Sequence, residues 1–451
     1  MRTWLYAVMV VLYLIVKVGQ VTALTPLLSG LALVAIAVSL LACSWITRGL
    51  AALFLGAGSW LLMHAGVAWH EYLGAYGEML YLLALFIVVP LLSVPVRLGG
   101  YDKAIETILT GRVTSLFSFN CVVTGLAFIC GSFMSMAAVP VMMASMGAVV
   151  NRYPIPDRVR FMAVSTTYGY VLPVLWTPVS GVAGIVLDAL KVEWIDLFSK
   201  LFLVSVAGLL VNWIIFYFLE VRGKPPCRAA EAAPDDTGTA SPVARLLQMI
   251  CAIVLLIGSI ALLEQWLRIG LVTVVTLISI PYAILWCIVI GKGRPSLRET
   301  GSQLVLRLPA MADQFAIFLS AGFFARALQI SGADQTVNLL FLQFRELVGT
   351  QALLLLMPLM ALTTSFLGMH PLVVIALLGN SLKPEILGVS ALQLAIALVG
   401  SSVLTYMLGP FSGTLGLVQS INRVSTFRLS LWNAPYAFGY FVLLAIAIML
   451  A

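Results

Sequence analysis

One short polar motif occurs twice in this apolar chain. The stretch 178–186 reads Pro-x-Ser-Gly-x-x-Gly-aliphatic-Val, and the stretch 410–418 repeats it at an offset of 232 (410 − 178). Pro and Gly interrupt a helix, and the interruption leaves backbone N–H and C=O groups without intrahelical partners. At membrane depth such groups are tolerated only where protein encloses them. The two stretches are therefore candidate binding elements, because helix N-termini attract anions and free carbonyls attract cations.

Two weaker matches lie upstream of the motif in the same order. The stretch 132–136 (SFMSM) matches 365–369 (SFLGM) at an offset of 233 (365 − 132), and 100–102 (GYD) matches 332–334 (GAD) at 232 (332 − 100). Three matches in one order and at nearly one offset predict two structural repeats.

Hydroxyl, glycine and proline residues at these stretches, with one histidine, are the predicted solute-binding residues. They are Ser132, Ser135, Thr177, Pro178, Ser180 and Gly181 in the first repeat, and Ser365, His370, Thr405, Pro410, Ser412, Gly413 and Thr414 in the second. Small polar residues also pack membrane helices together, so a structural role is the alternative for each of them. For His370, hydrogen bonding to an anion, proton relay and a structural role all stay open.

The composition identifies the class of protein. The 451 residues are 62% hydrophobic and 10% charged, with a mean hydropathy of +1.08, which predicts an all-α, polytopic membrane protein. A net charge of +7 would suggest nucleic acid in a soluble domain, but here the basic residues lie between apolar runs. The six cysteines have no paired spacing, so neither a disulfide nor a metal site is expected.

Apolar runs of about 20 residues predict eleven membrane spans. The spans are 3–18, 25–45, 50–69, 79–97, 160–190, 197–220, 244–264, 269–291, 311–330, 386–422 and 430–450. Spans 160–190 and 386–422 contain the repeated motif and are expected to be broken helices. Two further apolar stretches, 114–150 and 348–382, divide at Gly131-Ser132 and at Gly368 into short pieces, which predicts re-entrant hairpins. The amphipathic segments 100–113 and 333–347 predict an interfacial arm helix before each hairpin.

The spans divide the chain into a leading helix (1–20), a first repeat (21–221), a hydrophilic cytoplasmic linker (222–243) and a second repeat (244–451). With the N-terminus in the cytoplasm and the C-terminus outside, eighteen Lys and Arg lie inside and seven outside, which agrees with the positive-inside rule. Equivalent spans are five apart, an odd number, so the second repeat is expected to be inverted. The first apolar run also resembles a signal peptide, but a retained span is favoured.

This arrangement resembles the ion transporter superfamily, and most closely the divalent-anion/sodium symporter (dicarboxylate transporter) architecture. The resemblance rests on 132–140 and 178–184 in one half and on 365–371 and 410–416 in the other. The symporters carry Ser-Asn-Thr at their hairpin tips, and both tips of this chain lack the Asn. The resemblance implies a homodimer with a fixed scaffold and a moving solute-binding domain. It also implies sodium or a proton as coupling ion, with sodium near Ser132, Ser180, Ser365 and Ser412.

The expected function is secondary active transport of a small organic anion, such as a carboxylate, across the cytoplasmic membrane by alternating access. No cofactor and no nucleic-acid partner are expected. A sodium/proton or inorganic-anion exchanger of the same superfamily is the first alternative. A membrane-embedded enzyme is the second, and it would need a paired acid/base or metal set that the sequence does not display beyond His70-Glu71. No nucleotide-binding Gly-x-x-x-x-Gly-Lys-Ser/Thr loop occurs in the chain.

Overall fold

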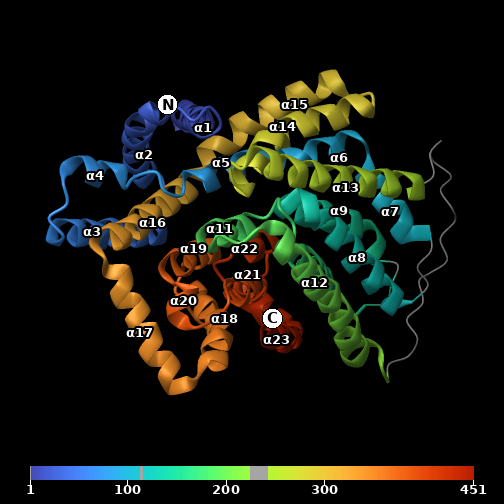
Figure 1. Cartoon of the computed structure of the whole chain (residues 1–451). Helices are drawn as coiled ribbons and strands as arrows, with labels where there is room; N and C mark the ends of the chain where they lie inside the picture. Colours follow the sequence, from blue (N-terminus) through green and yellow to red (C-terminus); the bar gives the residue numbers. More distant parts are fainter. Residues whose placement is uncertain (1, 112–114, 152, 154, 224–241) are drawn as a thin grey trace.

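The computed structural model describes residues 2–111, 115–151, 153, 155–223 and 242–451 (Figure 1). Every regular element in these ranges is a helix, which confirms the all-α fold class. The predicted linker 222–243 lies almost entirely outside the described residues. In the first half, the helices are α1 (Arg2–Val18), α2 (Thr25–Leu40), α3 (Trp45–His64), α4 (Trp69–Gly74), α5 (Leu80–Val88), α6 (Val94–Leu98), α7 (Tyr101–Gly111), α8 (Leu116–Met134), α9 (Ala138–Val150), α10 (Arg158–Val171), α11 (Gly181–Leu190) and α12 (Trp194–Phe216).

The second half begins after the linker. Its helices are α13 (Pro242–Leu267), α14 (Leu271–Val289), α15 (Gly293–Arg307), α16 (Ala312–Ser331), α17 (Ala333–Val348), α18 (Thr350–Phe366), α19 (Pro371–Ser381), α20 (Pro384–Leu387), α21 (Ala391–Leu408), α22 (Gly413–Asn422) and α23 (Thr426–Leu450). Short 3-10 turns join several helices, among them η2 (Val89–Ser93), η3 (Ser135–Ala137) and η4 (Leu172–Leu175). Each of η2 and η4 contains a proline, which cannot continue an α-helical hydrogen-bond ladder.

Ten helical segments in the described residues are long and apolar enough to cross a membrane, or up to eleven if a bent pair counts as one span. Nine of the ten coincide with predicted spans, and the tenth, Leu116–Gly147, is the segment predicted as the first hairpin. Two predicted spans are missing from the set because α1 has only 17 residues and because the span 160–190 is divided into α10 and α11. The chain is thus a multi-pass membrane protein.

Both predicted hairpins fold back on themselves. In hairpin 1 (α8, η3 and α9), the ring of Phe119 at the start of α8 stacks on Tyr153, just beyond α9, with centroids 4.4 Å apart. In hairpin 2 (α18 and α19), Arg345 precedes the first helix and donates to the carbonyl of Leu387, beyond the second, at 2.8 Å. In each hairpin the start of the first helix and the end of the second therefore lie on the same side. The turn of hairpin 1 lies at Ser135, with φ of 50°, and not at the predicted Gly131-Ser132.

An arm helix precedes each hairpin, as predicted. The first arm is α7, which packs along α9. The second arm is α17, and it meets α18 at an angle of 119° across the single residue Gly349. Gly349 has a φ of 85°, a left-handed value that only glycine adopts without strain. The sharp corner between arm and hairpin therefore depends on this glycine.

Equivalent helices of the two halves make equivalent contacts. Helix α3 of the first half packs along α16 of the second. Helix α14, the counterpart of α3, packs along α5, η2 and α6, which together are the counterpart of α16. Helices α11 and α22 begin and end at the same offset, 232 (413 − 181), and each is followed by a left-handed residue, Lys191 with φ of 57° and Arg423 with φ of 55°. This correspondence is what two halves related by pseudo-twofold symmetry produce. The domain boundaries and the inversion of the second half stay predictions.

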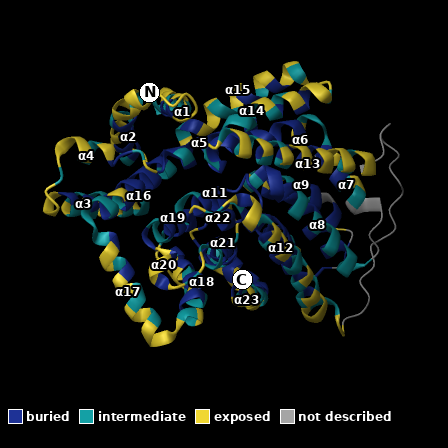
Figure 2. Ribbon diagram, in the orientation of Figure 1, coloured by how far each residue is buried: buried dark blue, intermediate teal, exposed yellow. Residues whose placement is uncertain are grey.

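Several details differ from the predicted map. The structure has helices α4 and α15 where loops were expected, and the helix predicted from 386 starts at Ala391, after the separate turn α20. Figure 2 shows where the molecule is buried: dark blue concentrates on α11 and α21 near its centre, whereas α1–α3, α13 and α17 carry exposed residues along their length. Most residues of α10 and α16 are buried as well. The broken helices therefore occupy the centre, where a polar site would be shielded from lipid.

Candidate functional site

The first broken helix is interrupted at residues 176–180, named break 1, and its polar groups are largely satisfied. The Thr177 hydroxyl donates to the carbonyl of Ser132 in hairpin 1. The Ser205 hydroxyl donates to the carbonyl of Leu172 at 2.8 Å, and the Trp194 indole donates to that of Trp176 at 3.1 Å. Every residue of break 1 is buried. Prolines free carbonyls in a helix, and here neighbouring side chains bind those carbonyls again.

The second broken helix is interrupted at residues 409–412, named break 2, and it is more open. The Asn433 amide donates to the carbonyl of Met407 at 3.0 Å, and the Ser412 hydroxyl donates to that of Tyr406 at 3.3 Å. Phe411 is nevertheless 44% exposed, and Gly413 is partly exposed. Break 2 therefore has one accessible side, which break 1 lacks.

Ser180 and Ser412, the duplicated serines of the motif, are helix caps. The Ser180 hydroxyl accepts from the Val182 N–H at 3.3 Å, and the Ser412 hydroxyl accepts from the Leu415 N–H at 3.3 Å. A capping serine contributes typically about 1 kcal/mol to helix stability. The motif is thus explained locally: Pro ends one helix segment, Ser caps the next, and Gly opens it. Contact of these two serines with a solute stays a prediction.

The tips of the two hairpins and the two breaks form a closed ring of contacts. Hairpin 1 meets break 1 through Thr177 and Ser132, and α11, which follows break 1, packs against α19 of hairpin 2. Hairpin 2 contacts break 2 through Ser365 and Gly409. The two are so close that a Cβ atom added to Gly409 would lie 2.1 Å from Ser365 Oγ. Break 2 meets hairpin 1 where a Cβ on Gly413 would lie 2.7 Å from Met136 Cε. The predicted residues of both repeats are therefore brought together around one centre.

Four helices begin at this ring. Helix α9 starts at the tip of hairpin 1, α19 at the tip of hairpin 2, and α11 and α22 at breaks 1 and 2. The N-terminus of a helix carries a partial positive charge and free N–H donors. Four such ends at one centre favour a negatively charged group there.

His370 caps the helix that begins at the tip of hairpin 2. Its Nδ1 accepts from the Leu372 N–H at 3.3 Å, and its ring lies edge-on to Phe318 of α16 with centroids 5.4 Å apart. An accepting Nδ1 places the proton of the neutral ring on Nε2. His370 therefore offers one N–H donor at Nε2, and adding a proton at Nδ1 would break the cap.

Two hydroxyls of the ring have no hydrogen-bond partner. They are Ser365 Oγ and Thr414 Oγ1, and both residues are fully buried. The Tyr170 hydroxyl approaches Thr414 and Ser135, but the geometry at Thr414 falls short of a hydrogen bond. A buried hydroxyl without a partner costs on the order of 1–3 kcal/mol, so such groups in a native fold require an explanation. A bound solute that hydrogen-bonds to both would supply one.

A further unpartnered group lies near break 1, but it faces apolar surroundings. The indole N–H of Trp176 has no partner, and its ring contacts Phe128, Phe198 and Phe202. An aromatic cluster offers nothing polar to a solute. The described residues also include unpartnered buried hydroxyls at Thr167, Thr300 and Ser320, on α10, α15 and α16; those of Ser365 and Thr414 are the two that belong to the predicted binding residues.

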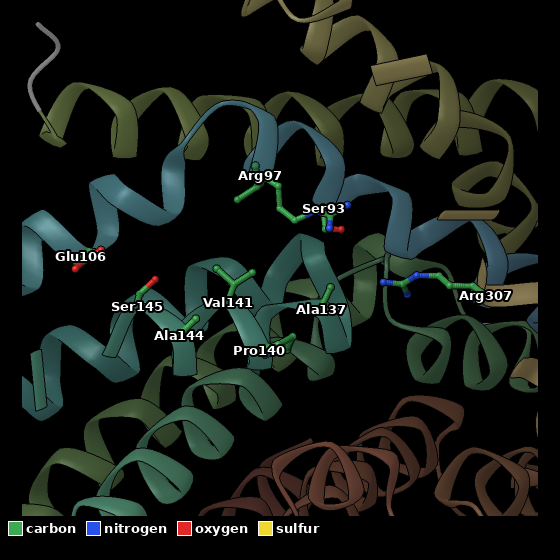
Figure 3. A pocket seen from close by; sticks show the side chains of 10 residues that line it. Ser93, Arg97, Glu106, Ala137, Pro140, Val141, Ala144, Ser145 and Arg307 are labelled. Carbon is green, nitrogen blue, oxygen red and sulfur yellow. The ribbon is translucent and has the colours of Figure 1, made fainter. Parts of the chain in front are cut away.

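The sequence did not identify a cavity that lies beside the tip of hairpin 1. It has a volume of about 390 Å³, and it is lined by residues of η2, α6, α7, η3 and α9 and by Arg307 (Figure 3). Two arginines, Arg97 and Arg307, contribute to it. They belong to different halves of the chain, so only the fold brings them to one place. In the described part of the chain, no three His, Cys, Asp or Glu residues are placed to hold a metal ion.

No protein-family model matches the chain, and no curated protein matches it in sequence. Among solved structures, it is similar to the crystal structure of the YdaH transporter of Alcanivorax borkumensis, whose topology is described as unusual. The TM-score is 0.60 at 14% sequence identity, and the match covers 89% of this chain and 98% of the transporter. The chain therefore has the fold of a membrane transporter over most of its length.

Proposed function

We propose that this protein is a secondary active transporter that moves a small organic anion, such as a carboxylate, by alternating access. The solute would bind inside the ring formed by the two hairpin tips and the two breaks. Sodium or a proton would drive it, and the protein would work as a homodimer in the cytoplasmic membrane, as the resemblance to the dicarboxylate transporters implies.

One observation carries this proposal: two buried hydroxyls, Ser365 Oγ at the tip of hairpin 2 and Thr414 Oγ1 in the first turn of α22, lie unpartnered on either side of break 2. Hydroxyls and helix N-termini donate hydrogen bonds to anionic oxygens. The Nε2–H of His370 would add a further donor. The two hairpins are the elements that alternating access would move.

The chemistry of the ring favours an anion over a cation as the main solute. Hydrogen-bond donors are in excess, since several of the carbonyls freed at the breaks are already bound by Thr177, Ser205, Trp194, Ser412 and Asn433. A sodium ion needs free carbonyl and hydroxyl oxygens, and its predicted place near Ser132 competes with the bond from Thr177. Of the two transport hypotheses, sodium/proton exchange therefore has less support than transport of an organic anion.

A thermal-shift panel tests the proposal. Purified protein is heated with mono-, di- and tricarboxylates, sulfate and phosphate, with and without sodium. We expect at least one carboxylate to raise the melting temperature, because a ligand that binds only the folded state stabilises it by mass action. The shift should be lost in Ser365→Ala and in Thr414→Val.

Ser420→Ala is the matched control. Ser420 lies on α22 with Thr414, but it is exposed and its hydroxyl donates to the carbonyl of Leu417. This variant should keep the full solute response. If no anion shifts the melting temperature, or if Ser365→Ala responds like the unmodified protein, the ring is not the solute site. Counterflow in proteoliposomes then separates the alternatives, since an inorganic-ion exchanger requires no organic solute.

A further inference from the structure

The cavity beside hairpin 1 adjoins the ring at the tip of that hairpin, but none of the predicted solute-binding residues lines it. One wall is the tip and α9 of hairpin 1, which contribute the small side chains Ala137, Ala144 and Ser145. The facing wall is formed by Ser93 and the α6 residue Arg97. Figure 3 shows Glu106 at one end of the cavity and Arg307 at the other, with Arg97 and Ser93 between them. Its volume of about 390 Å³ lies within the range of pockets that bind small molecules.

The arginine end of this cavity carries an uncompensated positive charge. Arg97 forms an ion pair with Glu299, which does not line the cavity. Arg307 donates from Nε to the neutral side chain of Gln303 at 3.0 Å, and no ion-pair partner of Arg307 lies among the described residues. The two guanidinium groups are close enough to act on each other electrostatically. Glu299 offsets one of the two charges, so one remains.

The geometry of the donors suits an oxyanion. A guanidinium has five N–H donors in a planar fork that matches carboxylate, sulfate and phosphate oxygens. One edge of Arg97 is used by Glu299 and only Nε of Arg307 is used by Gln303, so both retain free N–H groups. The Ser93 hydroxyl, which lines the same space, already donates to the carbonyl of Pro90 at 2.7 Å. The two arginines are therefore the donors available to a bound anion.

We propose that this cavity is a second anion site, in which Arg97 and Arg307 hold one oxyanion group beside hairpin 1. The group is either that of a free small anion or the phosphate of a lipid headgroup, because both present the same oxygens. The site is distinct from the solute site in the ring, since the two meet only at the tip of hairpin 1 and none of the predicted solute-binding residues lines the cavity. It would raise the local concentration of anions next to the hairpin.

Charged thiol reagents on a cysteine in the cavity test this site. Ala144→Cys is introduced where the exposed Cys251 and the linker residue Cys227 are Ser, and the protein is placed in nanodiscs of neutral phosphatidylcholine. Each rate is divided by the rate of the same reagent with a free thiol in solution, and on this scale the anionic sulfonatoethyl methanethiosulfonate should label residue 144 faster than the cationic trimethylammonioethyl reagent. Arg307→Gln should lower this rate ratio roughly twofold or more, because removal of one unit charge roughly 10–15 Å away in aqueous surroundings changes the rates of the anionic and cationic reagents in opposite directions.

Two further variants control the measurement. Arg298→Gln removes an exposed charge from the same helix, α15, but does not line the cavity, so the rate ratio should stay unchanged. Glu106→Gln should raise the ratio, because it removes the one acidic side chain from the lining. Equal labelling by the two reagents relative to a free thiol, or an effect of Arg298→Gln as large as that of Arg307→Gln, would overturn the proposal.

Protection experiments identify the source of the oxyanion. Inorganic sulfate should slow labelling at residue 144 in neutral nanodiscs if the site takes free anions, whereas phosphatidylglycerol in the nanodisc should do so if it takes lipid phosphate. Either result supports the site, and the absence of both contradicts it. Ser365→Ala should leave this protection intact while it removes the solute response, so failure of one proposal is distinguishable from failure of the other.

Discussion

In the first repeat the Thr177 hydroxyl ties the tip of hairpin 1 to break 1, whereas in the second repeat the equivalent position is Gly409, which has no side chain to offer. Ser365 comes so close to Gly409 that a Cβ there would lie 2.1 Å from its hydroxyl oxygen. The hydroxyl of Ser365 has no partner, whereas that of Ser132 donates to the carbonyl of Ile129 at 2.7 Å. The difference of Thr against Gly explains why the first hairpin tip receives a side-chain hydrogen bond from its break and the second does not.

Hairpin 2 is held at its base instead. Lys383 pairs with Asp334 of the arm at 2.8 Å, and Asn338 binds the Ser381 carbonyl and the Lys383 N–H. These contacts join the arm helix to the end of the hairpin that is opposite its tip. At the tip, the Ser365 hydroxyl makes no hydrogen bond to break 2. Two repeats with one motif therefore differ in which end of the hairpin is fixed. We expect the tip of hairpin 2 to separate from its break more easily than that of hairpin 1.

The largest expected effect comes from filling the space at Gly409. A Cβ there would also lie 2.6 Å from the backbone oxygen of Thr405, which cannot move aside easily. Gly409→Val should lower the free energy of unfolding by about 1–3 kcal/mol or more and abolish the solute response. Unfolding in mixed detergent micelles measures the first, and the thermal-shift panel the second. Gly416→Ala is the control, since nothing lies within 4 Å of its Cβ; equal stability of the two variants would refute the close contact.

Breaking the base of hairpin 2 should have the next largest effect. Asn338 is fully buried, and its side chain makes three hydrogen bonds to backbone groups. Asn338→Ala leaves the Ser381 carbonyl and the Lys383 N–H without these partners and should cost about 2 kcal/mol of unfolding free energy. Hydrogen exchange should rise at α19 and α20 but not at α9. If hydrogen exchange at α9 rises equally, the contacts at the base of hairpin 2 also stabilise hairpin 1, and the prediction is wrong.

Removing the bond at the tip of hairpin 1 should cost less, because Thr177 makes two such hydrogen bonds and Asn338 three: its hydroxyl donates to the carbonyl of Ser132 and accepts from the Val179 N–H at 3.4 Å. Thr177→Val keeps the shape of the side chain and leaves the Ser132 carbonyl without its donor. The expected loss is about 1–2 kcal/mol of unfolding free energy, with faster hydrogen exchange at the end of α8. Val179→Thr, a neighbouring change in the same buried break, adds a hydroxyl rather than removing one and serves to separate loss of the bond from general damage. An unchanged exchange rate in Thr177→Val would contradict a bonded tip.

The smallest effect on stability is expected at Ser365. Its hydroxyl has no partner, so Ser365→Ala should change the free energy of unfolding by less than about 0.5 kcal/mol or raise it slightly. Unfolding is measured without any solute. A loss above about 1 kcal/mol would mean that the hydroxyl is bonded in the solute-free protein, and the comparison with Thr177 would then fail.

The sequence was sufficient for the main architecture because hairpins and breaks are local features of polarity and length. Pro178 and Pro410 marked the breaks, and the common offset of the repeats aligned α11 with α22. The turn of hairpin 1 was misplaced because Gly131 was interpreted as a turn residue. In the fold it permits close approach of two helices, since a Cβ there would lie 3.0 Å from the Tyr170 backbone oxygen.

The asymmetry of the two tips and the arginine cavity could not be predicted in the same way. Whether Ser365 is bonded depends on the distance to Gly409, and whether Arg97 meets Arg307 depends on how α6 packs against α15. Such contacts arise from tertiary packing, for which no local pattern in one sequence is diagnostic. Ser180 and Ser412 illustrate the converse: their duplicated context was visible, but their role as helix caps became clear only from the hydrogen bonds.

The bend at Gly349 determines how far the tip of hairpin 2 moves when α18 rotates relative to α17. Helix α18 has 17 residues, which at about 1.5 Å per residue makes a lever of about 26 Å from corner to tip. A rotation of only about 10° at this one residue would sweep the tip through about 4–5 Å, more than the width of a water molecule. The 119° bend depends on one glycine. A small change in the backbone torsion angles of Gly349 would therefore produce a much larger displacement at the tip of hairpin 2.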